Sequence, residues 1–339
     1  MERLSDSKYE EENALHKRQL TKLVGRIPNN NKLIKTVRAH QGWWRAFVLG
    51  LPEGEYLSKN THKMERVCNR THEEQDNAAK NFLTTSAVKT AQLTLKERNK
   101  SSGGKIEIER LWYNLLSSQP LCFNFFGELM FDTSFGLKVL QTWWPNLTEL
   151  VKVEFEYSPP ERFTGDNSAF DIALKVKDGE KRGLIGLECK YTDTFSFKPK
   201  GSDIFYGDKG NKNHDTYLDV FDHAVMGFTK SYYDYVKSKD YNQLFRNQLI
   251  AESQLDNDKY DFVYTGLFCF EKDESAIQVG KNFQRMLAEP ERFSVITYQD
   301  FISKVQGLEL NWEQREWTML LWARYCATQL SEPIHNTIL

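Results

Sequence analysis

The sequence predicts an α/β fold, of the α+β kind with one mixed sheet, whose core runs helix, three strands, helix, strand. Segments that alternate apolar and polar residues, or are apolar throughout, are typical of strands, and they lie at 151–157, 170–176, 183–192 and 261–270. Apolar residues at helical spacing instead mark 241–252, between the third and fourth of these strands. Short links let the first three strands pair antiparallel, whereas the intervening helix lets the fourth join in parallel.

Two helices are predicted before the sheet. Apolar residues at helical spacing predict the first over 106–116, and we expect Pro120 to end it. The second is predicted over 134–144, where Pro145 would end it.

The C-terminal third continues with elements that extend this core. We expect a helix over 275–287, a short strand over 294–297 and an amphipathic helix over 312–327. The last of these closes the chain as a C-terminal helix.

A flexible break divides the chain at Ser101-Ser102-Gly103-Gly104. We therefore predict a mostly helical N-terminal extension over 1–105, which is a candidate for nucleic-acid or partner contacts. The remainder, 106–339, would form the main domain and would carry an insertion at 193–240 after the third strand.

Composition limits the protein classes to which the chain can belong. Its 339 residues suggest about two domains, and 40% hydrophobic content with 13% aromatic residues is typical of a folded protein. A formal net charge of −2 excludes a uniformly basic nucleic-acid coat, so any nucleic-acid surface must be local. Five scattered cysteines without a C-x-x-C pair argue against a disulfide framework. No apolar run reaches a membrane span, and the polar start resembles no signal peptide, so we expect a cytoplasmic protein.

Basic residues accumulate in 13–52, which contains no acidic residue. Arg18, Lys22 and Arg26 share one helical face if a helix continues through them, and a pair of tryptophans follows. Two interpretations stay open. The stretch is either a solvated helix face followed by core tryptophans, or a phosphate-contacting patch with aromatic stacking partners.

The chemistry of the chain concentrates on the second and third predicted strands. Asp171 lies on the second strand, and Glu188 and Lys190 lie two residues apart, hence on one face, of the third. An acid within an apolar strand needs a partner when it is buried. Carboxylate oxygens suit Mg²⁺ or Mn²⁺, and a lysine can act on the attacking water or the developing charge. This pattern predicts a metal-dependent phosphodiester hydrolase, whereas a surface aspartate and an edge-strand glutamate would be its structural alternative.

The trio and the element order together resemble the PD-(D/E)xK nuclease superfamily, whose restriction-endonuclease-like core is αβββαβ. Phe170 takes the place of the motif's proline. The chain is also similar over most of its length to a bacterial branch of restriction-endonuclease-like proteins. That similarity rests on these segments: Asn81-Phe82-Leu83-Thr84, Glu109-Arg110-Leu111-Trp112, Leu115-Leu116-Ser117-Ser118-Gln119-Pro120-Leu121-Cys122-Phe123-Asn124, Phe126-Gly127, Ser168-Ala169-Phe170-Asp171, Gly186-Leu187-Glu188-Cys189-Lys190-Tyr191-Thr192 and Gln243-Leu244-Phe245-Arg246-Asn247-Gln248-Leu249.

The resemblance implies further ligands for a metal held by the two acids. It makes the backbone carbonyl of Cys189 a metal ligand, while the Cys189 thiol would belong to the core. It also makes Glu109 a candidate third carboxylate, although a solvent-facing glutamate paired with Lys105 is an equal alternative. Glu154 and Glu156, on the neighbouring strand, are alternative ligands.

Several residues near the trio are predicted to contact nucleic acid. Gln243, Arg246 and Gln248 begin the helix after the site; Arg246 could bind a phosphate, and Gln248 could brace a metal-bound water. Structural hydrogen bonding beside the core is an equal alternative for these three. Tyr191 and Thr192 extend the catalytic strand toward the substrate backbone.

The insertion at 193–240 carries many aromatic residues and several lysines. A long segment beside an active site is often a lid or a binding loop. We therefore expect it either to grip the substrate by stacking and phosphate contacts, or to form a helical subdomain packed on the sheet.

Together these observations predict a Mg²⁺-dependent endonuclease that acts on DNA rather than RNA, in restriction or anti-phage defence. Its partners would be nucleic acid and either a second copy or a larger defence complex, with no membrane. Two alternatives stay open: a non-catalytic nucleic-acid-binding module, and a structural subunit that docks through its N-terminal helices.

Overall fold

The computed structural model describes residues 6–28, 30–58, 61–72, 79–98, 104–192, 210, 212–224, 227–236 and 240–338. The chain forms two compact units. The first consists of Met1–Leu83, Glu107–Pro120 and Met319–Leu339, and the second consists of Thr84–Ile106 and Leu121–Thr318.

The second unit is built on a five-stranded mixed sheet. Its strands, in spatial order, are β3 (Glu149–Tyr157), β4 (Phe170–Asp178), β5 (Lys181–Lys190), β6 (Phe262–Cys269) and β7 (Phe293–Thr297). β3, β4 and β5 pair antiparallel, whereas β6 and β7 join in parallel. This order confirms the predicted mixed α/β fold and adds β7 at the edge.

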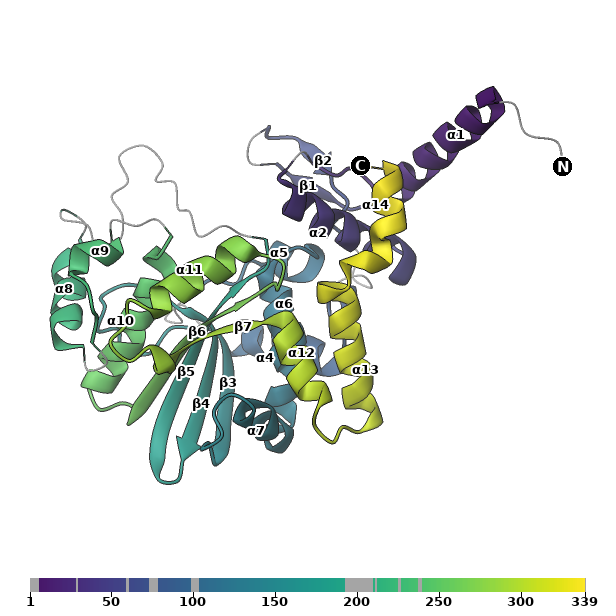
Figure 1. Cartoon of the computed structure of the whole chain (residues 1–339). Helices are drawn as coiled ribbons and strands as arrows, with labels where there is room; N and C mark the ends of the chain where they lie inside the picture. Colours follow the sequence, from purple (N-terminus) through teal and green to yellow (C-terminus); the bar gives the residue numbers. More distant parts are fainter. Residues whose placement is uncertain are drawn as a thin grey trace. The chain divides into compact units, whose positions relative to one another are not determined.

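Helices cover both faces of this sheet (Figure 1). On one face lie α10 (Asn242–Asp256) and α11 (Glu274–Gln284), and on the other lie α6 (Ser118–Phe131), α7 (Thr133–Gln141) and α12 (Tyr298–Gln306). Ile250 of α10 belongs to the cluster around Ala173, whereas Phe125 of α6 packs against Phe268. Because both faces are covered, β5 is apolar and buried on both sides from Gly183 to Leu187, as its continuous apolar run predicts.

The structure corrects two predictions around Pro120. The preceding helix, α5 (Ile108–Tyr113), ends well before it, and Pro120 lies in the first turn of α6. Proline is tolerated there because the first N–H groups of a helix have no intrahelical partner. α6 escaped prediction because it is mostly apolar and its few polar residues do not define an amphipathic period.

Two further differences from the predicted helices concern α7 and α12. α7 ends at Gln141, short of Pro145. α12 was not predicted; it begins after the N-cap Thr297, whose side chain accepts a hydrogen bond from the Asp300 N–H at 3.1 Å.

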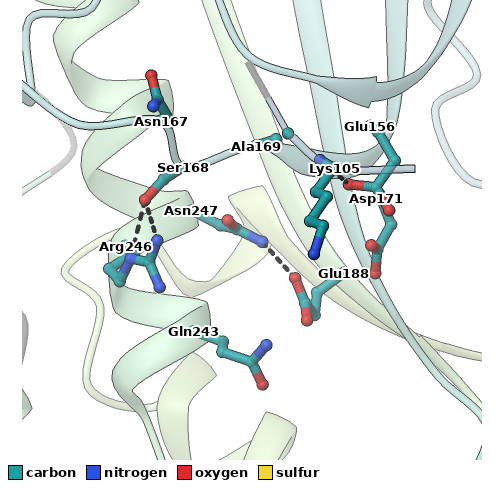
Figure 2. Close-up of a pocket in the computed structure, with 11 residues that line it drawn as sticks. Lys105, Glu156, Asn167, Ser168, Ala169, Asp171, Glu188, Gln243, Arg246 and Asn247 are labelled. Carbon is teal, nitrogen blue, oxygen red and sulfur yellow. Dashed lines mark hydrogen bonds between the residues drawn. The ribbon is translucent and has the colours of Figure 1, made fainter. Parts of the chain in front are cut away.

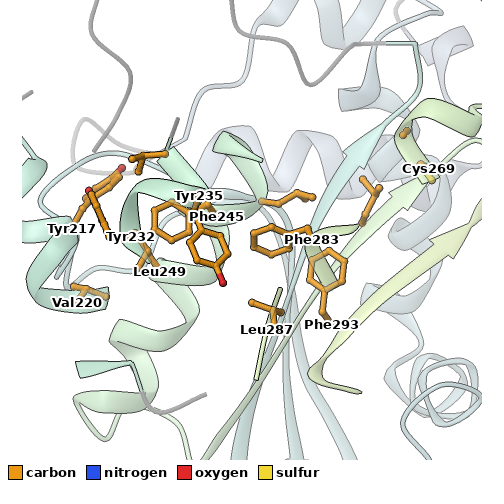
Figure 3. Close-up of a cluster of buried hydrophobic side chains, with 14 residues drawn as sticks. Tyr217, Val220, Tyr232, Tyr235, Phe245, Leu249, Cys269, Phe283, Leu287 and Phe293 are labelled. Atoms are coloured by element: carbon orange, nitrogen blue, oxygen red, sulfur yellow. The ribbon is translucent and has the colours of Figure 1, made fainter. Parts of the chain in front are cut away.

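The described part of the predicted insertion is helical and packs onto the sheet layer. It forms α8 (His214–His223) and α9 (Tyr232–Val236). Their aromatic side chains join those of α10, α11 and β7 in one buried cluster (Figure 3). This favours the subdomain interpretation for these residues, whereas 193–209 lie outside the described residues. The second unit also contains α4 (Thr85–Glu97).

The first unit contains segments from both ends of the chain. It contains α1 (Asp6–Val24), α2 (Lys32–Trp43), the π-helical turn Trp44–Val48, β1 (Glu55–Leu57), β2 (Met64–Arg66), the 3₁₀ turn Ala79–Asn81, α5, the π-helical turn Trp322–Cys326, the 3₁₀ turn Thr328–Ser331 and α14 (Glu332–Ile338). The β1–β2 hairpin interrupts a region expected to be helical. The predicted C-terminal helix over 312–327 is α13 (Trp312–Leu321) followed by a π-helical turn.

A buried arginine organises the core of the first unit. The Arg45 guanidinium is 1% exposed and donates hydrogen bonds to the carbonyls of Leu23, Val24, Leu51 and Cys68. Burial lowers the pKa of Arg45, since water no longer stabilises the charge. Trp44 beside it is also buried. These two members of the basic stretch are therefore structural.

The two units divide the chain after Leu83, Ile106, Pro120 and Thr318. One of these positions lies one residue from the predicted boundary between 1–105 and 106–339, and that domain division stays a prediction. None of the helices that the structure describes combines the length and apolar composition that crossing a membrane requires.

Candidate active site

Three carboxylates lie in a row across three neighbouring strands. Phe155 pairs with Ile172, and Ile172 pairs with Leu187. The same register, continued by one residue, sets Asp171 between Glu156 of β3 and Glu188 of β5. Directly opposed side chains in such pairs have Cβ atoms about 4.5–5.5 Å apart.

The row forms one wall of a pocket of about 480 Å³ within the second unit (Figure 2). The other lining residues come from the loop before α5, the β3–β4 connection and α10: Gly104, Lys105, Asn167, Ser168, Ala169, Gln243, Arg246 and Asn247. One wall of the pocket is therefore acidic, and the facing wall carries amides and cations.

The carboxyl of Asp171, in the middle of the row, is buried and close to two other acids. Its Oδ2 accepts a hydrogen bond from the Cys189 N–H at 2.7 Å. Burial, and then the charges of Glu188 and Glu156, raise the pKa of Asp171 well above its usual range, although Lys190 opposes them. Positive charge brought beside Asp171 would favour its ionised form.

Glu188 and Lys190 form a buried ion pair. Glu188 Oε1 lies 2.9 Å from Lys190 Nζ, and their side chains are 8% and 7% exposed. Glu188 Oε2 accepts a hydrogen bond from Asn247 Nδ2 at 2.9 Å. Both side chains point to one face of β5, as strand alternation predicts. The ion pair with Glu188 links the lysine to the acidic row.

Cys189 points to the opposite face, where it meets Cys122 of α6. The two thiols share a hydrogen bond. Burial raises the pKa of Cys122 to about 11 and raises that of Cys189 well above its ordinary value. The Cys189 thiol is thus a core group, as predicted. The role of its backbone carbonyl as a metal ligand stays a prediction.

The first turns of α10 supply the polar wall. Gln243, Arg246 and Asn247 all line the pocket. Arg246 Nε donates to Ser168 Oγ at 2.8 Å, and its Nη2 lies 3.7 Å from Asp166 Oδ2. Asn247 was not predicted, although it lies four residues after Gln243 and so shares its helical face.

Comparison with known families agrees with this geometry. A family model for the PD-(D/E)XK nuclease superfamily matches residues 28–327. The chain belongs to that superfamily. No curated protein and no solved structure gives a significant match to it. Membership of the superfamily suggests a nuclease, and PD-(D/E)XK nucleases generally use divalent metals.

Two residues predicted to contact the nuclease's substrate are instead core residues. Gln248 is completely buried; its Oε1 accepts from Thr265 Oγ1 at 2.5 Å, and its Nε2 donates to Glu252 Oε1 at 2.8 Å. Gln248 lies four residues before Glu252 on α10, and its side chain points toward the sheet rather than toward the pocket. This burial favours the structural alternative for Gln248, and its role toward a metal-bound water stays a prediction.

Tyr191 is the second of these. Its side chain is 1% exposed and packs against Phe270 and Tyr298, because it follows the apolar face of β5. This burial argues against a direct contact between the Tyr191 side chain and the substrate, and any contact at Tyr191 stays a prediction. A contact through the half-buried Thr192 stays a prediction.

The additional carboxylates divide between different environments. Glu154 pairs with Lys152 at 3.0 Å and with Lys175 at 2.5 Å, and does not line the described pocket, whereas Glu156 does. Glu109 belongs to the first unit, where it pairs with Arg70 rather than with Lys105. Its role as a metal ligand in the superfamily fold stays a prediction.

The predicted basic face of the N-terminal helix is shorter than expected. Arg18 and Lys22 are exposed on α1, but the helix ends at Val24 and Gly25 has φ of 87°. Arg26 therefore leaves the helical face and pairs with Glu65 at 2.6 Å. Nucleic-acid binding by Arg18 and Lys22 stays a prediction.

The acidic row fits the divalent metal that the superfamily generally uses. Among the residues that the structure describes, no three acidic, cysteine or histidine side chains are spaced to hold a metal by themselves. Mg²⁺, however, is usually held by one or two carboxylates together with water and substrate phosphates. Asp171 and Glu188 provide that number of hard oxygen donors. Burial, and then the neighbouring acids, raise the pKa of Asp171, and a dication beside it would act against both effects.

Proposed function

We propose that this chain is a Mg²⁺- or Mn²⁺-dependent endonuclease that hydrolyses phosphodiester bonds, with DNA favoured over RNA. The observation that carries the proposal is the Glu156–Asp171–Glu188 row, closed at one end by the buried Lys190 ion pair. Acids this close repel one another and are costly to bury together. In a purely structural role they would lower the stability of the folded state.

Each group in the pocket has a distinct role in this proposal. Asp171 and Glu188 would hold the metal, which supplies positive charge at the phosphate and a water of lowered pKa when it is bound. Lys190, fixed by Glu188, would orient the attacking water and offset developing negative charge. Arg246, held by Ser168 and Asp166, would contact a phosphate oxygen.

A cleavage panel tests the proposal. We expect the wild type to cut at least one of duplex DNA, single-stranded DNA and RNA with Mg²⁺, and to cut none of them with EDTA. Asp171→Ala and Lys190→Ala should each lower the rate at least about 100-fold. Glu154→Gln is the matched control, since Glu154 lies on β3 but does not line the described pocket. Variants that cut as fast as the wild type would refute the assigned roles, and faster cutting of RNA would refute the DNA preference.

A non-catalytic nucleic-acid-binding module is the second candidate. Both oxygens of Glu188 already carry partners, Lys190 on Oε1 and Asn247 on Oε2, and this favours a site that binds without a metal. Such a module would bind DNA equally well in Mg²⁺ and in EDTA and would cut nothing.

A restriction or anti-phage setting, and a homodimer or a larger complex, belong to the same proposal. Phage should form fewer plaques on cells that express the wild type than on cells that express Asp171→Ala. Equal plaque numbers would count against the defence role. Concentration-dependent assembly without metal-dependent cleavage would instead favour a structural subunit.

A further inference from the structure

We propose that Lys105 is a second substrate-binding cation of this pocket, which contacts a phosphate of the nucleic acid beside Arg246. The inference rests on the proposed function, because it takes a nucleic acid as the ligand. Lys105 lies in the second unit, in the segment that follows α4 in the sequence. It lines the pocket together with residues of the β3–β4 connection.

Hydrogen bonds hold the backbone of Lys105 over the acidic row. The Lys105 N–H donates to Glu156 Oε2 at 3.3 Å, and the Gly104 N–H donates to the Asn167 carbonyl at 3.3 Å. Two segments of the pocket wall therefore fix the loop from which the lysine projects.

Close packing at Gly104 fixes the same loop. Gly104 has φ of +67°, and a Cβ there would lie 2.5 Å from the Glu156 carbonyl oxygen and 3.1 Å from Ala169 Cβ. Only glycine fits such an approach without moving backbone. Glu156 on the other side also has a positive φ, of 49°, a conformation that is unfavourable for glutamate and often marks a functional site.

The two lysines near the acids differ in their access to a ligand. The Lys190 side chain is 7% exposed, is paired with Glu188, and is not one of the described residues that line the pocket. Lys105 is exposed, and its side chain extends into the pocket toward Glu188 (Figure 2). A phosphate that enters the pocket would therefore meet the ammonium of Lys105, together with Arg246, rather than that of Lys190.

The charge of the lining supports a phosphate ligand once a metal is present. Three carboxylates, Glu156, Asp171 and Glu188, oppose the two cations Lys105 and Arg246, so the ionised lining carries −1. One divalent ion would change this charge to +1. Removal of Lys105 would return it to zero, so we expect substrate binding to depend on this lysine as well as on the metal.

Binding without turnover tests the assignment. The probe is a fluorescein-labelled DNA duplex with single-stranded arms, measured by anisotropy with Ca²⁺ in place of Mg²⁺ and over a series of salt concentrations. Lys105→Ala should weaken binding about tenfold, as for loss of one charge-assisted contact. It should also reduce the slope of log K against log salt by about 0.7–0.9, the value for one phosphate contact. Lys105→Arg should keep most of the affinity.

Lys138→Ala is the matched control, because Lys138 is exposed on α7, which packs on the other face of the sheet. It should bind as the wild type does. Weaker binding by Lys105→Ala with an unchanged salt slope would show a structural role and overturn the inference. Unchanged binding by Lys105→Ala, with weaker binding by Arg246→Ala, would overturn it and leave the proposed function intact. If the wild type binds no DNA, both fail.

Discussion

Asp171 shows how a single residue stores unfavourable energy at the candidate site. Burial and two neighbouring acids raise its pKa well above the ordinary value of an aspartate. Between the unfolded and the folded pKa, the folded chain binds a proton that the unfolded chain has lost. The free energy of unfolding therefore falls as pH rises through that window.

Asp171→Asn should remove this penalty while its amide oxygen still accepts from the Cys189 N–H. In EDTA at pH 7 we expect the variant to be more stable than the wild type by at least about 1 kcal/mol, since one pKa unit corresponds to about 1.4 kcal/mol. The difference should shrink below about pH 4, where both states are protonated. Urea unfolding at the two pH values measures it. Asp178→Asn, at the far end of β4, is the control, and a wild type as stable as Asp171→Asn at pH 7 would contradict the prediction.

Gly104 and Gly179 allow two costs of an added side chain to be measured separately: the cost of a positive φ, and the cost of a clash with neighbouring backbone. Both have positive φ, of 67° and 58°, but a Cβ at Gly179 would meet nothing within 4 Å, whereas at Gly104 it would meet the Glu156 backbone. Gly179→Ala should therefore cost only the left-handed penalty of about 1–2 kcal/mol. Gly104→Ala should cost clearly more, measured by the same unfolding experiment. Equal losses would show that the loop at Gly104 can move aside.

At the scale of the element, α10 serves two purposes on two sides. Gln243 and Asn247 face the pocket, whereas Gln248 faces the sheet and bridges Thr265 and Glu252. Helical geometry separates these roles, because residues one position apart point about 100° away from each other.

Substitution on the two sides of α10 should therefore have separable effects. Gln248→Ala leaves two buried groups without their partner, so the free energy of unfolding should fall by about 2–3 kcal/mol. Gln243→Ala should change stability by less than about 0.5 kcal/mol but weaken DNA binding. Thermal unfolding and anisotropy on both variants distinguish the sides. A stable Gln248→Ala variant that has lost DNA binding would restore the original prediction for Gln248.

At the scale of the whole molecule, the first unit depends on segments from both ends of the chain. Arg324 is completely buried, and its Nη1 and Nη2 donate to the carbonyl and the side-chain oxygen of Asn81 at 2.7 and 2.6 Å. Ile334 and Ile338 likewise pack against the cluster of Val24, Val67 and Cys68.

Loss of this link should destabilise the first unit selectively. Arg324→Ala leaves the oxygens of Asn81 buried without their donor, so we expect a loss of about 3 kcal/mol. Hydrogen exchange should show the loss in α2 and not in β4 or β5 of the second unit. Arg315→Ala, exposed on α13, is the control and should change stability by less than about 0.5 kcal/mol. Equal loss of protection in both units would show that they unfold together.

The sequence by itself determined the sheet of this protein. Strand alternation, an apolar third strand and an intervening helix placed β3 to β7 within two residues of their observed ends, and placed Asp171 beside Glu188 and Lys190. These patterns are local, since a strand's period of two shows which face each side chain occupies.

Only the tertiary structure decided which residues share the pocket and which are core. Lys105 and Asn247 reach the acidic row through chain segments remote in sequence, and Tyr191 and Gln248 turn away from it because of what packs against them. A mostly apolar helix such as α6 shows no clear amphipathic period from which it could be predicted. Burial depends on neighbours brought together by folding, and no single segment of the sequence encodes those neighbours.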